Sequence, residues 1–177
     1  WATPTITLGR LQNPATNLSL EQLQEEGVDW IRRPTGGRAV LHHNDLTYSC
    51  IFSTGIKEMK STITETYQVI SHCLMKGLTA VGIRCTPHES VLDADLIRKD
   101  VKLPCFLAPN REELMVAGKK LVGSAQKRCI HGVLQHGSIP LGGEFRTLPR
   151  FLNLPAEQRR LQRLLLSRKC VCVQELW

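Results

Sequence analysis

Two basic, glycine-containing stretches of this 177-residue sequence combine residue types that could handle a ligand. One reads R-R-P-T-G-G-R-A-V-L-H, from Arg32 to His42, and the other reads G-K-K-L-V-G-S-A-Q, from Gly118 to Gln126. Glycine and other small residues let a backbone pass close to a ligand, because no large side chain stands in the way. Neither stretch is a nucleotide-binding fingerprint, since the sequence contains no G-x-G-x-x-G and no G-x-x-x-x-G-K-[ST] pattern.

Each stretch also has a plain structural interpretation. The glycine pair at Gly36–Gly37 stands between two runs of strand-forming residues, which is typical of a β-hairpin turn. Side chains alternate between the faces of a strand, so Lys120 would share a face with Ser124 while Lys119 points the other way. One lysine could therefore enter a pocket, or both could lie in water on a hairpin.

Two further segments carry chemically useful side chains. Cys105, in P-C-F, follows a proline in an expected loop, where reactive groups tend to lie, although a single cysteine is also commonly a small buried hydrophobe. It precedes Lys120 by 15 residues (120 − 105), which is enough chain to fold back. His136 and Gly137 interrupt an expected core strand, L-Q-H-G-S-I-P-L, where the glycine indicates a bulge or a close backbone approach and the histidine could simply be part of the core.

Taken in order, the four segments resemble the biotin/lipoate protein ligase superfamily over residues 1–141. The similarity is greatest to its cysteine-dependent octanoyl-[acyl carrier protein]:protein N-octanoyltransferase branch, because D-L-T-Y-S follows the histidines and P-C-F precedes G-K-K-L-V-G-S-A-Q. The resemblance implies an α+β fold with a mixed, largely antiparallel sheet flanked by helices. Short turns between most of the expected strands independently favour such a sheet over a doubly wound one.

The resemblance also implies an activity and a set of site residues. Cys105 would be the nucleophile that carries the acyl group as a thioester, and Lys120 would lower the pKa of Cys105 and contact the acyl carbonyl. The acyl chain would lie in a tunnel beside the glycine turn, lined by Arg33, Gly36, Gly37, His42, Gly123, Ser124, Ala125, His136 and Gly137.

In this branch, octanoate moves from acyl carrier protein to a lysine of a lipoyl domain, such as that of the glycine-cleavage H protein, as the first step of endogenous protein lipoylation. No cofactor or metal is implied. The alternative within the superfamily is an ATP-dependent lipoate-protein ligase in which Cys105 is incidental. A catalytically silent module that binds acidic or acylated proteins is a further alternative.

The domain organisation follows from the length and from the same resemblance. A chain of 177 residues favours one domain, and we expect residues 1–177 to form a single catalytic domain. The family carries an additional helix and strand before W-A-T-P-T-I-T-L-G, so we expect this sequence to lack its natural beginning. We expect a monomer.

Charge and cysteine content limit the partners and the compartment. A net charge of +7 favours acidic partners, whereas an aromatic content of 5% and the lack of a recognition motif argue against nucleic acid. No apolar run reaches the ~20 residues of a membrane helix. Seven cysteines, an odd number without paired zinc-ligand spacing, favour reduced thiols in a cytoplasmic protein over disulfides or a metal site.

Periodicity and turn residues predict the elements that would position these side chains. Strands are expected at residues 1–10, 28–33, 39–52, 83–86 and 133–141, with a hairpin about Gly118 formed by residues 113–117 and 121–125. A short helix is expected near residues 20–24. A T-x-x-E capping box at Thr62 and Glu65 would begin a helix whose apolar stripe is Tyr67, Ile70, Leu74, Leu78 and Val81. A basic helix at residues 155–169 would turn Leu161, Leu164 and Leu165 inward.

Overall fold

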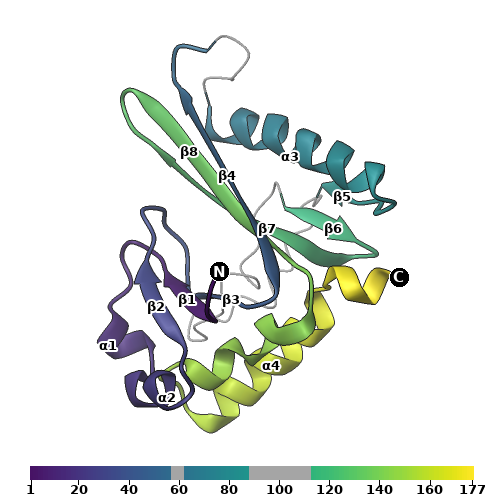
Figure 1. Ribbon diagram of the computed structural model, residues 1–177. Helices are drawn as coiled ribbons and strands as arrows, with labels where there is room; N and C mark the ends of the chain where they lie inside the picture. Colours follow the sequence, from purple (N-terminus) through teal and green to yellow (C-terminus); the bar gives the residue numbers. More distant parts are fainter. Residues whose placement is uncertain (57–61, 88–112) are drawn as a thin grey trace.

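The computed structural model describes residues 1–56, 62–87 and 113–177 (Figure 1). The predicted nucleophile Cys105 lies outside these residues. The elements are β1 (Thr5–Leu8), α1 (Pro14–Asn17), α2 (Leu20–Glu25), β2 (Asp29–Arg32), β3 (Val40–His42), β4 (Asp45–Ser53), α3 (Ile63–Ala80), β5 (Thr86–Pro87), β6 (Leu114–Val116), β7 (Lys119–Arg128), β8 (Gly132–Pro140), the 3-10 helix η3 (Gly143–Phe151), α4 (Ala156–Lys169) and the 3-10 helix η4 (Val173–Leu176).

The strands form two sheets that meet near the middle of the molecule. A three-stranded sheet has the order β2-β1-β3, in which β2 runs parallel and β3 antiparallel to β1. A five-stranded sheet has the order β4-β8-β7-β6-β5, and every pairing in it is antiparallel. Helices pack beside both sheets (Figure 1). The predicted mixed, largely antiparallel fold flanked by helices is confirmed.

The chain passes from one sheet to the other at a sharp corner after His42. The prediction of one strand over residues 39–52 is wrong, because β3 ends at His42 and β4 begins at Asp45 in the other sheet. Asn44 adopts a left-handed backbone conformation with φ of 55°. Asparagine tolerates that conformation better than most residues, so the run H-H-N-D contained the turn signal.

The glycine pair does not form a β-hairpin. Strands β2 and β3 both pair with β1, which lies between them, so the Gly36–Gly37 segment crosses over the end of β1. A Cβ at Gly9, just beyond β1, would collide with the carbonyl oxygen of Gly37. Glycine at position 9 therefore permits the crossing, and Gly37 itself has a φ of 93° that favours glycine.

Helix α3 packs on the five-stranded sheet and shares its core. Thr62 and Glu65 form the predicted capping box, and both reciprocal hydrogen bonds are present. Leu78 lies in a buried cluster with Leu121 and Ile139 from the sheet. The predicted apolar stripe is confirmed except at its end, where Val81 is the C-cap and is 59% exposed.

Two elements differ from the sequence prediction in position or orientation. The short strand expected at residues 83–86 begins only at Thr86. Helix α4 is present as predicted, but it buries Gln162 and Leu166. The expectation that Leu161, Leu164 and Leu165 point inward is wrong, because Leu161 is 42% and Leu164 46% exposed and Leu165 is only partly buried.

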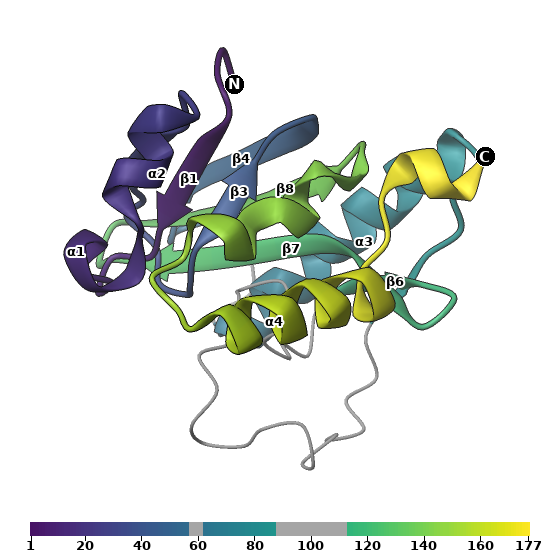
Figure 2. The ribbon, with the colours of Figure 1, turned by 90° about the horizontal axis from the view of Figure 1, so that it is seen from below.

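The C-terminal segment ties α4 to the strand that carries Lys120. Phe145, Leu166, Cys170 and Cys172 form a small buried cluster between η3 and α4. Just beyond the helix, the Val171 amide donates a hydrogen bond of 3.0 Å to the Lys120 carbonyl oxygen. Figure 2 shows α4 running alongside β7. Within the described ranges, no helix combines the length and apolar character that crossing a membrane requires.

Candidate functional site

A pocket lies where the two sheets meet, and it collects most of the residues that the family resemblance assigned to the acyl site. From that set, the lining includes Arg33, His42, Lys120, Gly123, Ser124, Ala125, His136 and Gly137. Thr7, Val40 and Ser138 complete the described lining. Gly36 and Gly37 are not part of this lining and form the crossing over β1 described above.

One wall of the pocket consists of small residues on β7 and β8. Gly123 lies opposite Ser138, and Ser124 lies opposite Gly137. A Cβ at Gly137 would collide with the Gly123 carbonyl oxygen and with the Tyr48 ring. The strand glycine is therefore required by a close approach of backbone and aromatic ring, which is one of the two interpretations that the sequence left open.

Tyr48 fixes this wall from the far side of the small residues. Its hydroxyl is 2.6 Å from Ser124 Oγ, and it also accepts a hydrogen bond of 3.3 Å from Gln135 Nε2. Burial raises the pKa of Tyr48 above its usual value, against the opposing effect of these two hydrogen bonds. A protonated phenol is thus held against Ser124, which limits the rotation of the serine side chain.

Lys120 is a buried cation whose side chain faces the pocket. It is only 4% exposed and forms an ion pair through Nζ with Glu113 Oε1, and Glu113 is 7% exposed. Lys119 is exposed, so of the two arrangements that the sequence left open the structure has the one with one inward and one outward lysine. An ion pair this deeply buried needs both partners, because removing either one leaves an uncompensated charge.

Cys170 lies beside the same ion pair but is a poor nucleophile. Its pKa is raised to about 11, chiefly by burial, and the nearby Lys120 charge lowers it only in part. A thiol with that pKa is almost entirely protonated at neutral pH, whereas the thiolate is the reactive species. Cys170 therefore contributes to packing behind Lys120.

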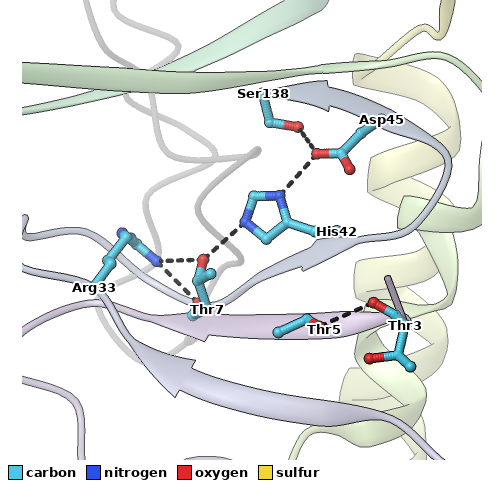
Figure 3. A network of polar contacts seen from close by, with 7 residues as sticks. All are labelled: Thr3, Thr5, Thr7, Arg33, His42, Asp45 and Ser138. Atoms are coloured by element: carbon cyan, nitrogen blue, oxygen red, sulfur yellow. Dashed lines mark hydrogen bonds and ion pairs between the residues drawn. The ribbon is translucent and has the colours of Figure 1, made fainter. Parts of the chain in front are cut away.

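The opposite wall is held by a chain of polar contacts that crosses between the sheets (Figure 3). His42 Nδ1 lies 2.8 Å from Asp45 Oδ2, and His42 Nε2 lies 3.0 Å from Thr7 Oγ1. Ser138 on β8 donates a short hydrogen bond to the same Asp45 oxygen. We call Thr7, Arg33, His42, Asp45 and Ser138 the joint network, because they connect β1, β3, β4 and β8.

Arg33 anchors the joint network to the glycine crossing. Its Nη1 donates to the Thr7 carbonyl and hydroxyl oxygens at 2.9 and 3.2 Å, and its Nη2 donates to the Gly36 carbonyl at 2.8 Å. A hydroxyl that accepts from Arg33 can give its own proton to His42 Nε2, which leaves the Nδ1 proton for Asp45. Both ring nitrogens of His42 then have protein partners, so the joint network orients this ring.

Asp45 remains ionised within the joint network. Burial raises its pKa, but the opposing effects, led by the hydrogen bonds from His42 and Ser138, outweigh burial, and the net pKa is lowered. Its second oxygen, Oδ1, is buried and has no hydrogen-bond partner among the described residues. Through these hydrogen bonds the Asp45 carboxylate, at the start of β4, fixes the position of β3 relative to β4 and β8.

His136 connects the glycine crossing to β8. Its Nε2 is 2.7 Å from Thr35 Oγ1. Burial, followed by the charges of Arg33 and His42, lowers the pKa of His136 below its usual value. The neutral ring shares this hydrogen bond with the Thr35 hydroxyl and forms part of the pocket lining.

Sequence reasoning missed several of the residues that build this site. Glu113 had a usable signal, because the predicted hairpin about Gly118 places it on the strand facing Lys120. Asp45 also stood beside a recognised histidine. Thr7 and Ser138 carry no such local signal, since they meet His42 and Asp45 only through the joining of two sheets.

Metal binding has no support in the described part of the chain. No group of three or more His, Cys, Asp or Glu side chains there comes together as metal ligands would. The six cysteines in those ranges, Cys50, Cys73, Cys85, Cys129, Cys170 and Cys172, are free thiols.

The sequence matches known proteins along almost its entire length. Curated octanoyltransferases named LipM from Lysinibacillus sphaericus, Bacillus cereus and Geobacillus kaustophilus are 37%, 38% and 39% identical to it over 181 residues, covering 99% of this chain. The chain spans 64–65% of the length of these relatives.

Solved structures show the same fold. Lipoate-protein ligase A bound with ATP superposes with a TM-score of 0.71 at 22% identity, covering 98% of this chain and 61% of that one. A bipartite lipoate protein ligase from Thermoplasma acidophilum gives a TM-score of 0.76 at 19% identity, covering 98% and 60%. Residues 1–171 match the model of the lipoyl protein ligase A/B catalytic domain, and the chain belongs to that family.

Proposed function

We propose that this chain provides the acyl site of an octanoyltransferase. Octanoate would move from acyl carrier protein to Cys105 as a thioester, and then to a lysine of a lipoyl domain such as that of the glycine-cleavage H protein. The observation that carries the proposal is the buried Lys120, which faces a pocket lined by small residues and is paired with Glu113. The names of the LipM relatives support the same activity.

The pocket wall suits a straight acyl chain. Gly123, Ala125 and Gly137 present little side-chain bulk, and Val40 adds an apolar contact from the other sheet. Burial of apolar surface stabilises a ligand by about 0.8 kcal/mol per methylene, so an eight-carbon chain gains roughly 5 kcal/mol. That binding free energy lets the pocket select medium-length acyl chains over very short ones. It does not let the pocket discriminate octanoyl from lipoyl groups.

Lys120 supplies the charge that acyl transfer needs. Attack on a thioester develops negative charge on the carbonyl oxygen, and a preorganised cation in a water-poor site stabilises that charge. Glu113 sets the position of the ammonium group before substrate arrives. An ammonium near Cys105 would also favour the thiolate over the thiol.

The proposed reaction has two acyl transfers. The Cys105 thiolate attacks the carbonyl carbon of the octanoyl thioester, and the carrier leaves as a thiolate when its carbon–sulfur bond breaks. The amine of the acceptor lysine then attacks the Cys105 thioester, forming the amide, losing one proton and releasing Cys105. The first transfer is nearly isoenergetic and the second is downhill, so no nucleotide is consumed.

A donor comparison on the full-length protein tests the proposal. Apo lipoyl domain is incubated either with octanoyl carrier protein alone or with free octanoate and ATP, and the product is measured by mass. The proposal predicts octanoylation with the carrier protein in the absence of ATP. Modification only with octanoate and ATP would instead identify an ATP-dependent ligase, and neither reaction would identify a binding module.

A further inference from the structure

The outer face of helix α4 forms a shallow groove that the acyl pocket does not use. The groove is lined by Glu157, Arg160, Leu161, Arg163, Leu164 and Ser167. The helix anchors itself through the other side, where Gln162 and Leu166 are buried. The two groove leucines are therefore exposed on a helix that already has its own core contacts.

The groove lies on a strongly basic helix and itself contains two arginines and one glutamate. The fourteen residues of α4 contain five cations and one acid, a sum of +4 (5 − 1), while the whole chain carries +7. Neither Arg160 nor Arg163 takes part in an ion pair within the described ranges, whereas Arg146 and Arg150 do. The four excess positive charges on this short helix repel one another, and this repulsion destabilises the folded protein. A bound acidic surface would offset the repulsion.

Apolar side chains between arginines indicate a protein partner. Interface cores combine leucine-like contacts with arginines that bind carboxylates in two-pronged geometry. A nucleic acid would instead be favoured by aromatic side chains for stacking, and α4 contains none. The chemistry of the groove thus fits an acidic protein surface with an exposed apolar residue.

The position of α4 connects this surface with the acyl pocket. Helix α4 ends at Lys169, and the next residue, Cys170, pairs with Lys120 in an isolated β-bridge. Lys120 is part of the pocket lining. A protein seated on α4 would therefore lie against the helix whose C-terminal end is bridged to Lys120, and Figure 2 shows this helix alongside β7.

We infer that the α4 groove is the docking surface for the acyl carrier protein that delivers the octanoyl group, an inference that rests on the proposed function. Acyl carrier proteins are small and acidic, so their carboxylates pair with Arg160 and Arg163 while an apolar side chain covers Leu161 and Leu164.

Charge reversal in the full-length protein tests the assignment. The double variant Arg160→Glu/Arg163→Glu is compared with Arg10→Glu/Lys127→Glu, which changes the net charge equally at exposed positions away from α4. With octanoyl carrier protein as donor, KM rises about tenfold or more in the α4 variant and less than twofold in the control. With a small octanoyl thioester as donor, both variants match the wild type.

A second variant separates the apolar contribution from the charge. Leu161→Ala/Leu164→Ala is expected to raise KM for octanoyl carrier protein severalfold while leaving the salt dependence of KM unchanged. In the charge-reversed variant, KM loses most of its dependence on salt. The ion pairs between the two arginines and the carrier protein, which salt screens in the wild type, are then absent.

Three results would overturn the inference. A rise in KM for the lipoyl domain alone would assign the groove to the acceptor, and a lower melting temperature with unchanged KM would mean that another part of the protein covers it. Salt-sensitive RNA binding that disappears in the variant would assign it to nucleic acid. If the wild type transfers no octanoyl group at all, binding of labelled octanoyl carrier protein, measured by fluorescence anisotropy, still tests the surface separately from the activity.

Discussion

The pocket wall on β7, which carries Lys120, and the opposite wall, which is the joint network, are built in different ways. Lys120 and Glu113 pair within one β6–β7 hairpin, only seven residues apart in sequence. The joint network brings together side chains from both sheets, with Asp45 and Ser138 separated by 93 residues. The first wall is a local charge aimed at a ligand, and the second is a long-range scaffold. We therefore expect mutations in the first to affect chemistry and mutations in the second to affect stability and binding.

The largest effect is expected from removing the charge of Lys120. Lys120→Met keeps most of the side-chain volume, so octanoyl transfer should fall by about 100-fold or more, as when an oxyanion contact is lost. Glu113 would remain buried without its cation, at a cost of ~3–5 kcal/mol in unfolding free energy. Lys119→Met, at the exposed neighbouring position, is the matched control and should change neither quantity.

A double variant separates the two consequences. Lys120→Met/Glu113→Gln removes both charges, so much of the lost stability should return in urea unfolding while transfer stays as low as in Lys120→Met. Recovery of transfer together with stability would show that Lys120 acts only through folding, and the contrast between the walls would disappear.

The next effect concerns the scaffold wall. Asp45→Asn removes a carboxylate that accepts from His42 and Ser138, and should cost about 1.5–3 kcal/mol, the usual range for hydrogen bonds to a charged group. The reoriented His42 should raise KM for the octanoyl donor, with kcat changed only a few-fold. A kcat loss as large as that of Lys120→Met, at unchanged stability, would place the joint network in the chemistry itself.

Acid should destabilise the folded protein through His136, which connects the glycine crossing to β8. Its pKa is lowered in the folded protein, so at pH below about 6.5 the unfolded chain binds a proton that the native state does not. The unfolding free energy should consequently decrease as pH falls from about 6.5 toward the folded-state pKa. Chemical denaturation between pH 5 and 8 should show a smaller pH-dependent decrease in unfolding free energy for His136→Gln than for the wild type. Equal pH dependence in the two proteins would argue against assigning the effect to His136.

The smallest effect is expected behind the small-residue wall. Tyr48→Phe removes one hydrogen bond to Ser124 and one to Gln135 without changing the ring, which should cost about 1 kcal/mol. A thermal melt measures this loss, and transfer should fall only slightly. A loss of transfer comparable to Lys120→Met would mean that the hydroxyl of Ser124 takes part in the reaction.

The same contrast explains how much of the site could be predicted from sequence. The β6–β7 hairpin follows from turn residues, which act over a few residues, and alternation along a strand left an inward Lys120 as one of two alternatives. The capping box at Thr62 and the basic helix are local in the same sense. Each of these predictions is confirmed by the structure.

The remaining features depend on contacts between distant segments. Whether Gly36–Gly37 forms a hairpin depends on β1, which inserts between β2 and β3 from thirty residues upstream (36 − 6), so local turn statistics favoured the wrong structure. Which face of α4 is buried was also misjudged, because Gln162 is buried in place of the expected leucines. The grouping of Thr7, His42, Asp45 and Ser138 requires the two sheets to be assembled first.

The most direct test of the proposed chemistry is the intact mass of the full-length protein after incubation with octanoyl carrier protein in the absence of ATP and acceptor. We predict a mass increase of one octanoyl group on the wild type, no increase on Cys105→Ser, and a strongly slowed increase on Lys120→Met. An adduct that survives Cys105→Ser, or no adduct on a wild-type protein that still octanoylates lipoyl domains, would contradict the account.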